Sequence, residues 1–94
     1  MSRRRSTVVP HAEVWPGYAT EVQHGPRTRL QAGDHVRVAA RKAGCHGFQG
    51  RFRFAFTDGD GTLTYCVSED EGNRVARVRY VKPVRVRSTP RRGK

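Results

Sequence analysis

The strongest constraint on the fold is an alternation of apolar and polar side chains along residues 48–56. The run Phe48-Gln-Gly-Arg-Phe-Arg-Phe-Ala-Phe56 has a period of two, which is typical of a strand whose two faces meet different surroundings. It predicts that the three later phenylalanines face inward and both arginines outward: Phe52, Phe54 and Phe56 against Arg51 and Arg53. No segment repeats apolar residues with helical spacing over a useful length, so we expect an all-β fold.

Four shorter segments with similar alternation are predicted to be further strands: residues 34–41, 62–67, 74–80 and 84–87. The predicted inward side chains are Val36, Val38 and Ala40, then Leu63, Tyr65 and Val67, then Ala76, Val78 and Tyr80. The sequence Asp58-Gly-Asp-Gly61 predicts a tight turn that joins two strands as a hairpin. Residues 68–73 are polar and are predicted to form a loop. Five strands of this length predict a small antiparallel barrel.

Apolar residues are unevenly distributed, and this divides the chain into four parts. Most Leu, Val and Phe residues lie within residues 30–87, the predicted barrel. Residues 10–29 contain several prolines and glycines without a period and are predicted to be an irregular arm. Residues 1–9 and 88–94 are predicted to be disordered basic tails. No apolar stretch reaches the roughly 20 residues that span a bilayer, so we expect a soluble, cytoplasmic protein with no membrane partner.

The charge of the chain indicates a polyanionic partner. Lys and Arg number 19 against 8 Asp and Glu, a formal net charge of +11. The excess remains when both tails are left out. Guanidinium groups match phosphate oxygens in pairs, and release of counterions favours their association with nucleic acid. Two alternatives stay open: codon usage in a GC-rich genome accounts for arginine in place of lysine, and a solvated basic face serves solubility.

The predicted strands place a set of arginines on one exterior face of the barrel. This candidate phosphate-binding set comprises Arg37, Arg41, Arg51, Arg53, Arg77, Arg79, Arg85 and Arg87. Like charges on neighbouring strands repel, so an anion lying across them would stabilise the fold. Trp15 and Phe48 are candidates for base stacking or partner contact, although an anchor that packs the arm onto the barrel is the favoured role for Trp15.

The sequence gives no support for catalysis, a metal or a cofactor. The candidate metal ligands are scattered without a paired motif: His11, His24, His35, Cys45, His46 and Cys66. The two cysteines are too few for a disulfide framework, and we expect both to be reduced. No acid/base pair or phosphate loop converges, and so small a core leaves no cavity for a small-molecule substrate. We therefore expect a protein that is not an enzyme.

Two stretches carry a resemblance to a known fold family. Gly33-Asp-His-Val-Arg-Val38 followed by Gly47-Phe-Gln-Gly-Arg-Phe52 resembles the first hairpin of KOW and Tudor-type domains. Arg79-Tyr-Val-Lys-Pro-Val-Arg-Val86 is similar to the short helical turn and last strand of Src-homology-3-like (SH3-like) barrels. The chain is also similar to small uncharacterised proteins of actinobacteria and their phages. The resemblance implies an SH3-like barrel over residues 33–87, located in the host cytoplasm if a phage encodes it.

These observations favour a non-catalytic module that binds the phosphate backbone of DNA or RNA through the arginine face. A protein-interaction adaptor is the alternative, for example a phage-encoded factor that engages a host protein through an apolar patch of Phe48, Val75 and Val81. A virion assembly component is a third reading.

Overall fold

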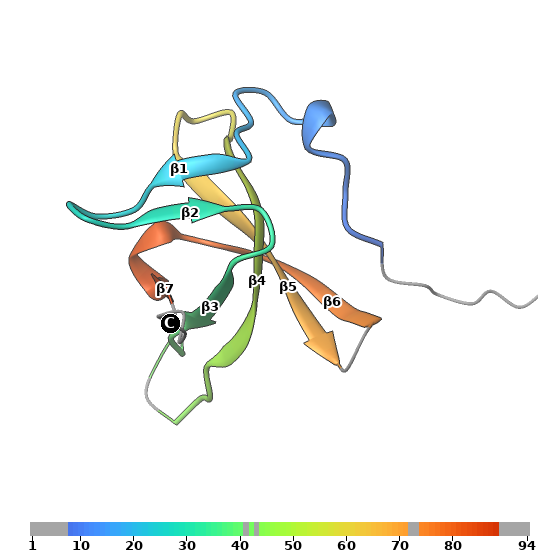
Figure 1. Cartoon of the computed structure of the whole chain (residues 1–94), viewed down its shortest axis with the longest axis vertical. Coiled ribbons are helices and arrows are strands. Elements are labelled where there is room, and N and C mark those ends of the chain that lie inside the picture. The colour runs from blue at the N-terminus through green and yellow to red at the C-terminus, as the bar shows by residue number, and fades with distance from the viewer. Residues whose placement is uncertain (1–7, 41, 43, 72–73, 89–94) are drawn as a thin grey trace, which may run out of the picture.

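The central element of the fold is strand β4 (Phe48–Thr57), which the computed structural model places in the middle of a five-stranded antiparallel sheet (Figure 1). The structure describes residues 8–40, 42, 44–71 and 74–88. The sheet order is β6 (Arg74–Val81), β5 (Leu63–Glu71), β4, β3 (His35–Val38) and β7 (Val86–Ser88). The predicted tails lie almost wholly outside the described residues.

Strand pairing confirms an all-β fold. Strand β3 pairs with β4 on one side and with β7 on the other, and the turn at residues 58–61 joins β4 to β5 as predicted. In that turn the Asp58 carboxylate accepts hydrogen bonds of 3.0 Å from the backbone N–H groups of Asp60 and Thr62. Within the described residues no pairing joins the edge strands β6 and β7, so the sheet is open and the predicted five-stranded barrel is not confirmed.

A bulge in β4 overturns the prediction that its phenylalanines share one face. Phe52 lies opposite Val67 and Phe54 lies opposite Cys66, so Arg53 is an extra residue that changes the phase of the strand. Phe52 therefore belongs to a first cluster with residues of β3, β5 and β7, whereas Phe54 and Phe56 belong to a second cluster with Cys66. Strand β5 is buried on both faces between these clusters.

The boundaries and phase of the later strands also differ from expectation. Strand β5 continues to Glu71, through the stretch predicted as a loop, because Ser68 and its neighbours pair with β6. Leu63 is 41% exposed and Tyr80 45% exposed, although both were expected to face inward. Val81, by contrast, is buried in the first cluster. Val78 and Tyr80 lie on the face of β6 that meets the second cluster, and Val81 lies on the opposite face, which meets the first cluster.

The chain reaches its last strand through a single turn of 3-10 helix. This turn, η2 (Pro83–Arg85), stands where the sequence analysis placed the start of the strand. Strand β7 consequently begins two residues later than predicted, at Val86.

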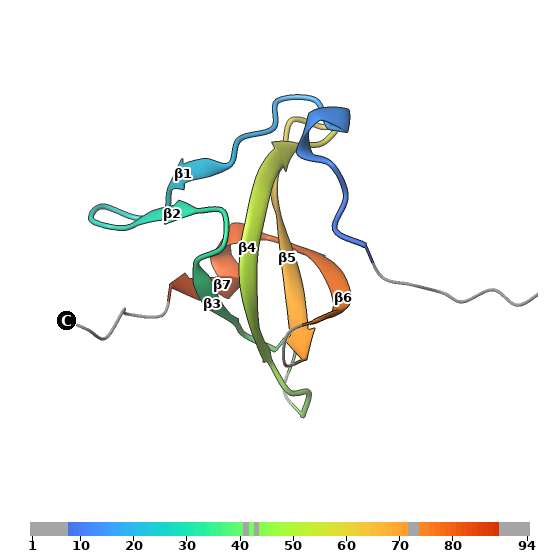
Figure 2. The same cartoon turned by 45° about the vertical axis from the view of Figure 1, so that its right-hand side comes forward.

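The arm predicted to be irregular contains regular structure. A 3-10 turn, η1 (Ala12–Val14), is followed by β1 (Glu21–Gln23), which pairs with β2 (Arg29–Gln31) in a small second sheet beside β4 (Figures 1 and 2). His24 fixes the loop of this hairpin to the core. Its Nε2 lies 2.7 Å from the Val86 carbonyl oxygen and its Nδ1 lies 2.9 Å from the Tyr65 hydroxyl. Because a carbonyl only accepts, Nε2 carries a proton.

The start of the arm packs on the second cluster. The ring centroid of Trp15 lies 4.6 Å from that of Phe56 in a stacked arrangement and 5.8 Å from that of Tyr80. Ala19 exchanges two backbone hydrogen bonds of 2.8 Å with Ala55 of β4. Trp15 therefore anchors the arm to the sheet, which is the second of the two roles considered for it. No helix in the described residues has the length and apolarity to cross a membrane.

Two glycines allow β4 to run close to its neighbours. A Cβ atom at Gly47 would meet the backbone carbonyl oxygen of Val38, and one at Gly50 would meet the carbonyl oxygen of Ser68. Both obstacles are backbone atoms, which cannot rotate away. These positions match the glycines of the hairpin motif in the sequence, and close backbone approach is the physical reason for them.

Candidate nucleic-acid interface

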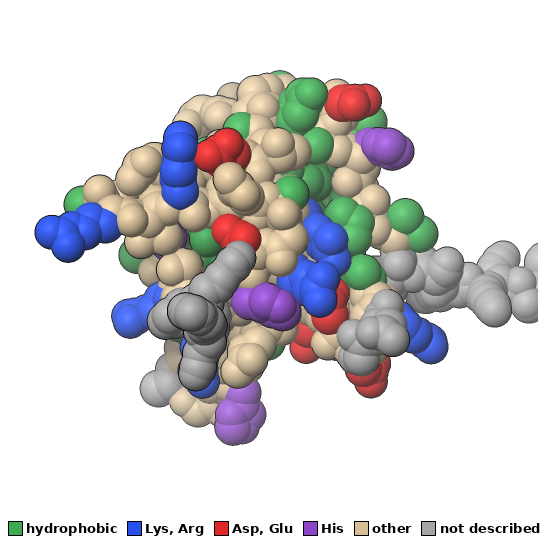
Figure 3. Space-filling view, in the orientation of Figure 1, with side chains coloured by type: hydrophobic (Ala, Val, Ile, Leu, Met, Phe, Trp, Pro, Cys, Tyr) green, Lys and Arg blue, Asp and Glu red, His purple; other side chains and the backbone are tan. Residues whose placement is uncertain are grey.

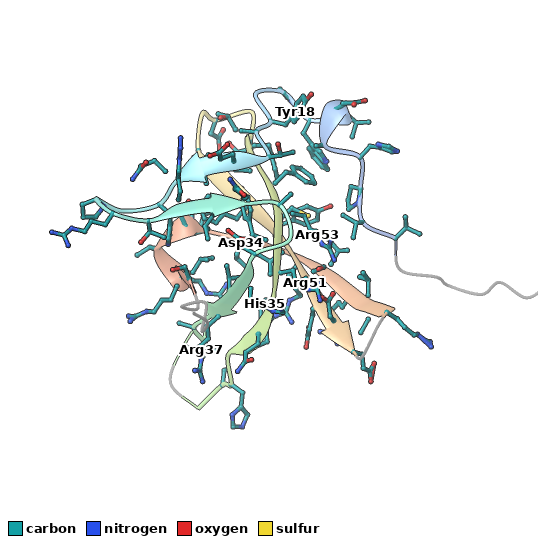
Figure 4. The ribbon with its side chains drawn as sticks, viewed as in Figure 1. Tyr18, Asp34, His35, Arg37, Arg51 and Arg53 are labelled. Atoms are coloured by element: carbon teal, nitrogen blue, oxygen red, sulfur yellow. The ribbon has the colours of Figure 1, made fainter. Side chains whose placement is uncertain are left out.

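The predicted arginines are divided among separate sites rather than gathered on one exterior face. On the face shown in Figure 3, basic and acidic side chains are interspersed. Figure 4 shows Arg37 at the end of β3 and Arg51 and Arg53 further along the sheet, on β4. The expectation of one shared arginine face is therefore wrong, and three groups of side chains replace it.

The first group is a pair of opposed cations on β3 and β7. Arg37 is the direct cross-strand partner of Arg87, and both residues are exposed. Neither guanidinium has an ion-pair or hydrogen-bond partner within the part of the chain that the structure describes. Directly opposed like charges destabilise a sheet by a few tenths to about 1 kcal/mol. An anion lying between the two guanidinium groups would relieve this repulsion.

Both of these arginines line a groove at the end of the sheet. The groove is formed by the end of β3, the connection into β4 and one residue of β7; its lining is Arg37, Val38, Ala39, Ala40, His46, Gly47, Phe48, Gln49 and Arg87. Ala39 and Gly47 in this lining are exposed residues. We call it the Arg37–Arg87 groove.

The second group surrounds Asp70. Its carboxylate lies 3.1 Å from Arg51 Nε and 3.7 Å from Arg53 Nη2, although the Arg51 contact is not aligned as a hydrogen bond. Arg53 Nε donates to the Ser68 hydroxyl at 2.8 Å, and that hydroxyl donates to Asp70 at 3.0 Å. With the Asp70 side chain only 18% exposed, this network fixes both arginines in place.

The third group surrounds Glu69, the residue next to Asp70 in β5. Consecutive strand residues leave opposite faces, so Glu69 meets a different pair of arginines. Its Oε1 accepts a hydrogen bond of 3.1 Å from Arg79 Nη1 and lies 3.9 Å from Arg77 Nε. The Arg79 guanidinium also lies over the ring of Phe48, 4.4 Å from its centroid.

The remaining predicted residues have other positions. Arg85 donates from Nε and Nη2 to the Ala39 carbonyl oxygen, at 3.1 and 2.8 Å, and thereby fastens the η2 turn to the end of β3. Arg41 lies outside the described residues. Phe48 is partly buried against the first cluster beneath Arg79, so little of its ring is open for a base to stack on.

Nothing in the described residues assembles into a metal site, since no three His, Cys, Asp or Glu side chains come together there. Cys45 is an exposed free thiol and Cys66 a buried one. Burial raises the pKa of the Cys66 thiol to about 12, against a smaller opposite effect of the Arg53 charge. Cys66 is thus an apolar core residue at neutral pH rather than a nucleophile.

Sequence reasoning missed the two residues that organise the arginines, Glu69 and Asp70. Both lay in the predicted loop, where an acid needs no partner. The signal that could have found them is the excess of arginine on both flanking strands, since adjacent acids on a strand between two basic strands would serve one neighbour on each face.

No protein-family model matches the chain, and no match was found among curated proteins or solved structures.

Proposed function

We propose that this protein is a non-catalytic module that binds the phosphate backbone of nucleic acid, with the Arg37–Arg87 groove as its primary contact. The observation that carries the proposal is the direct opposition of two exposed, unpaired guanidinium groups at the groove. A phosphate between them would convert their repulsion into two charge-assisted hydrogen-bonded contacts. The formal net charge of +11 favours the approach of a polyanion.

The proposal concerns the backbone rather than the bases. The described residues include no helix long enough to enter a major groove, and the aromatic candidates Trp15 and Phe48 are engaged within the fold. Contacts limited to phosphate carry no sequence information. Binding of this kind would tolerate any sequence, in DNA or RNA. We also propose that the fold is SH3-like, and the strand order, with β3 between β4 and β7, supports this proposal.

The apolar patch on which the protein-interaction adaptor alternative was based is not formed in the structure. Val81 is buried and Phe48 lies beneath Arg79, so these residues do not form an exposed apolar surface with Val75. We therefore put forward nucleic-acid binding alone.

A salt titration with a matched pair of variants tests the proposal. Labelled mixed-sequence DNA and RNA oligonucleotides are titrated with protein at several salt concentrations, and binding is followed by fluorescence anisotropy. The double variant R37S/R87S should bind more weakly to every sequence, and the slope of log affinity against log salt should become shallower by about 2. The control, R27S/R74S, removes two exposed arginines that have no ion pair in the described residues and do not line the groove.

The control carries the same charge change, so it measures the general electrostatic effect alone. Equal losses in the two double variants would contradict a role for the groove. A wild-type affinity that does not depend on salt would contradict phosphate binding altogether.

A further inference from the structure

The strand register places the Arg37–Arg87 groove and Arg51 on the same face of the sheet. Directly paired residues of a sheet have their side chains on one face, and alternate residues of a strand share that face. Arg37 pairs with Arg87 of β7 and with Gln49 of β4, which is part of the groove lining. Arg51 follows Gln49 two residues later in an uninterrupted register, so its side chain leaves the sheet beside the groove.

His35 occupies the position between the groove and Arg51. It is exposed, pairs directly with Arg51, and is two residues from Arg37 on the same strand. Figure 4 shows His35 between Arg37 and Arg51. Arg37 and Arg51 are diagonal neighbours in the pairing of β3 with β4, and such neighbours stand roughly 7–8 Å apart, within reach of long side chains. One nucleic-acid strand can therefore contact both guanidinium groups.

The contact with Asp70 leaves part of the Arg51 guanidinium available. The Asp70 carboxylate lies 3.1 Å from Nε of Arg51, and the Arg51 side chain is 42% exposed. A guanidinium has more N–H donors than one carboxylate can occupy, so the remaining donors can meet a phosphate. Because Asp70 already orders this side chain, Arg51 loses less conformational entropy when it binds.

We propose that a nucleic-acid strand bound in the Arg37–Arg87 groove continues across β3 and β4 to Arg51. The strand passes over His35, and Asp70 holds the Arg51 side chain in position. The proposal rests on the proposed function of the groove and names the direction in which the bound strand leaves it. Arg51 then contributes about one further phosphate contact to the same complex.

The Glu69 group supplies a matched control, because it lies on the other face of the sheet. Glu69 pairs with Arg77 and comes one residue after Ser68, the β5 partner of Arg51. Consecutive residues of a strand leave opposite faces, so Arg77 and Arg51 lie on opposite sides of the sheet. Each of these arginines has a carboxylate partner. Substituting either one removes one positive charge and one ion pair.

The test compares Arg51→Ser with Arg77→Ser. Both proteins are titrated with the same labelled mixed-sequence oligonucleotide over a range of salt concentrations. In R51S we expect weaker binding and a salt slope that is shallower by about 1, whereas R77S should keep the wild-type slope. Thermal unfolding checks that both variants are folded.

A substitution at His35 obstructs the strand without removing Arg51 or its contact with Asp70. His35→Glu places a carboxylate directly opposite Arg51, where it competes with phosphate for the guanidinium donors. We expect the salt slope to become shallower by about 1 to 2. The control, His11→Glu, makes the same charge change at an exposed residue that does not line the groove, and it should keep the wild-type slope.

Stoichiometry distinguishes one continuous contact surface from two separate sites. A titration with a short oligonucleotide at protein concentrations well above Kd should reach saturation at one oligonucleotide per protein. Saturation at two would overturn the continuous course from the groove to Arg51.

The remaining outcomes separate this proposal from the proposed function. Equal slopes in R51S and R77S, with weaker binding still seen in R37S/R87S, would overturn the contact with Arg51 and leave the groove in place. If R37S/R87S binds as the wild-type protein does, the proposed function and the course to Arg51 both fall.

Discussion

The indole N–H of Trp15 gives an unusual prediction for the stability of this protein. Trp15 stacks on Phe56 and contacts Tyr80, yet its Nε1 is buried without a hydrogen-bond partner in the described residues. Leaving a buried donor unsatisfied costs about 1–3 kcal/mol. The same side chain therefore both stabilises the arm and carries a penalty, and two substitutions separate these contributions.

The expected magnitudes follow from these contacts. Trp15→Ala removes the aromatic pair with Phe56, worth about 0.5–1.5 kcal/mol beyond area burial, together with the burial itself. We expect it to lower the free energy of unfolding by about 2–3 kcal/mol, less than a fully buried tryptophan because Trp15 is partly exposed. Trp15→Phe keeps a ring against Phe56 and eliminates the orphaned N–H. Its loss of ring area and the relief of that penalty should cancel to within about 1 kcal/mol.

Urea denaturation followed by far-ultraviolet circular dichroism measures both variants on one scale. Fluorescence is unsuitable for the comparison, because Trp15 is the only tryptophan in the chain. If Trp15→Phe destabilises the protein as much as Trp15→Ala does, then the buried N–H carries no penalty and the reasoning is refuted. A loss below about 0.5 kcal/mol for Trp15→Ala would show instead that the arm contributes nothing to the fold.

Two further predictions concern the strands themselves. Gly50→Ala should lower the free energy of unfolding by about 2 kcal/mol or more, because the added Cβ meets the Ser68 carbonyl oxygen. The control, Gly59→Ala, adds a Cβ in open space and should change the free energy of unfolding by less than about 1 kcal/mol in the same denaturation assay. Burial raises the pKa of the Cys66 thiol from 9.0 to about 12, so the unfolded chain loses this proton first and the free energy of unfolding should fall as the pH rises from 9 toward 12. Across that pH range, the urea midpoint of Cys66→Ala should fall less steeply than that of the wild-type protein. If the two midpoints fall equally with pH, the raised pKa of Cys66 in the folded state is contradicted.

The alternation of residues predicted where the strands lie better than which way their side chains face. Strand β4 and its hairpin with β5 followed directly from period two and from the turn at Asp58. The phase of the side chains depends on register, and one extra residue reverses it. The local sequence around Arg53 does not indicate a bulge, because the alternation of apolar and polar residues continues through Arg53 without interruption.

The candidate site shows the same division. The alternation predicted that Arg37 and Arg87 face outward from two separate strands, and the pairing of β3 with β7 makes them direct neighbours. The pairing of the other arginines with Glu69 and Asp70 was not predictable, because it depends on where β5 ends. A polar run such as Ser68-Glu-Asp-Glu71 has low strand propensity. It is part of β5 because its backbone pairs with β6, and Glu69 and Asp70 add ion pairs to the flanking strands.

The bulge at Arg53 has a consequence for how the molecule unfolds. Phe52 and Phe54 stand two residues apart on one strand, yet they anchor different apolar clusters on its two sides. Both clusters pack on the same β4–β5 hairpin, so we expect the two halves of the fold to unfold together in one cooperative transition.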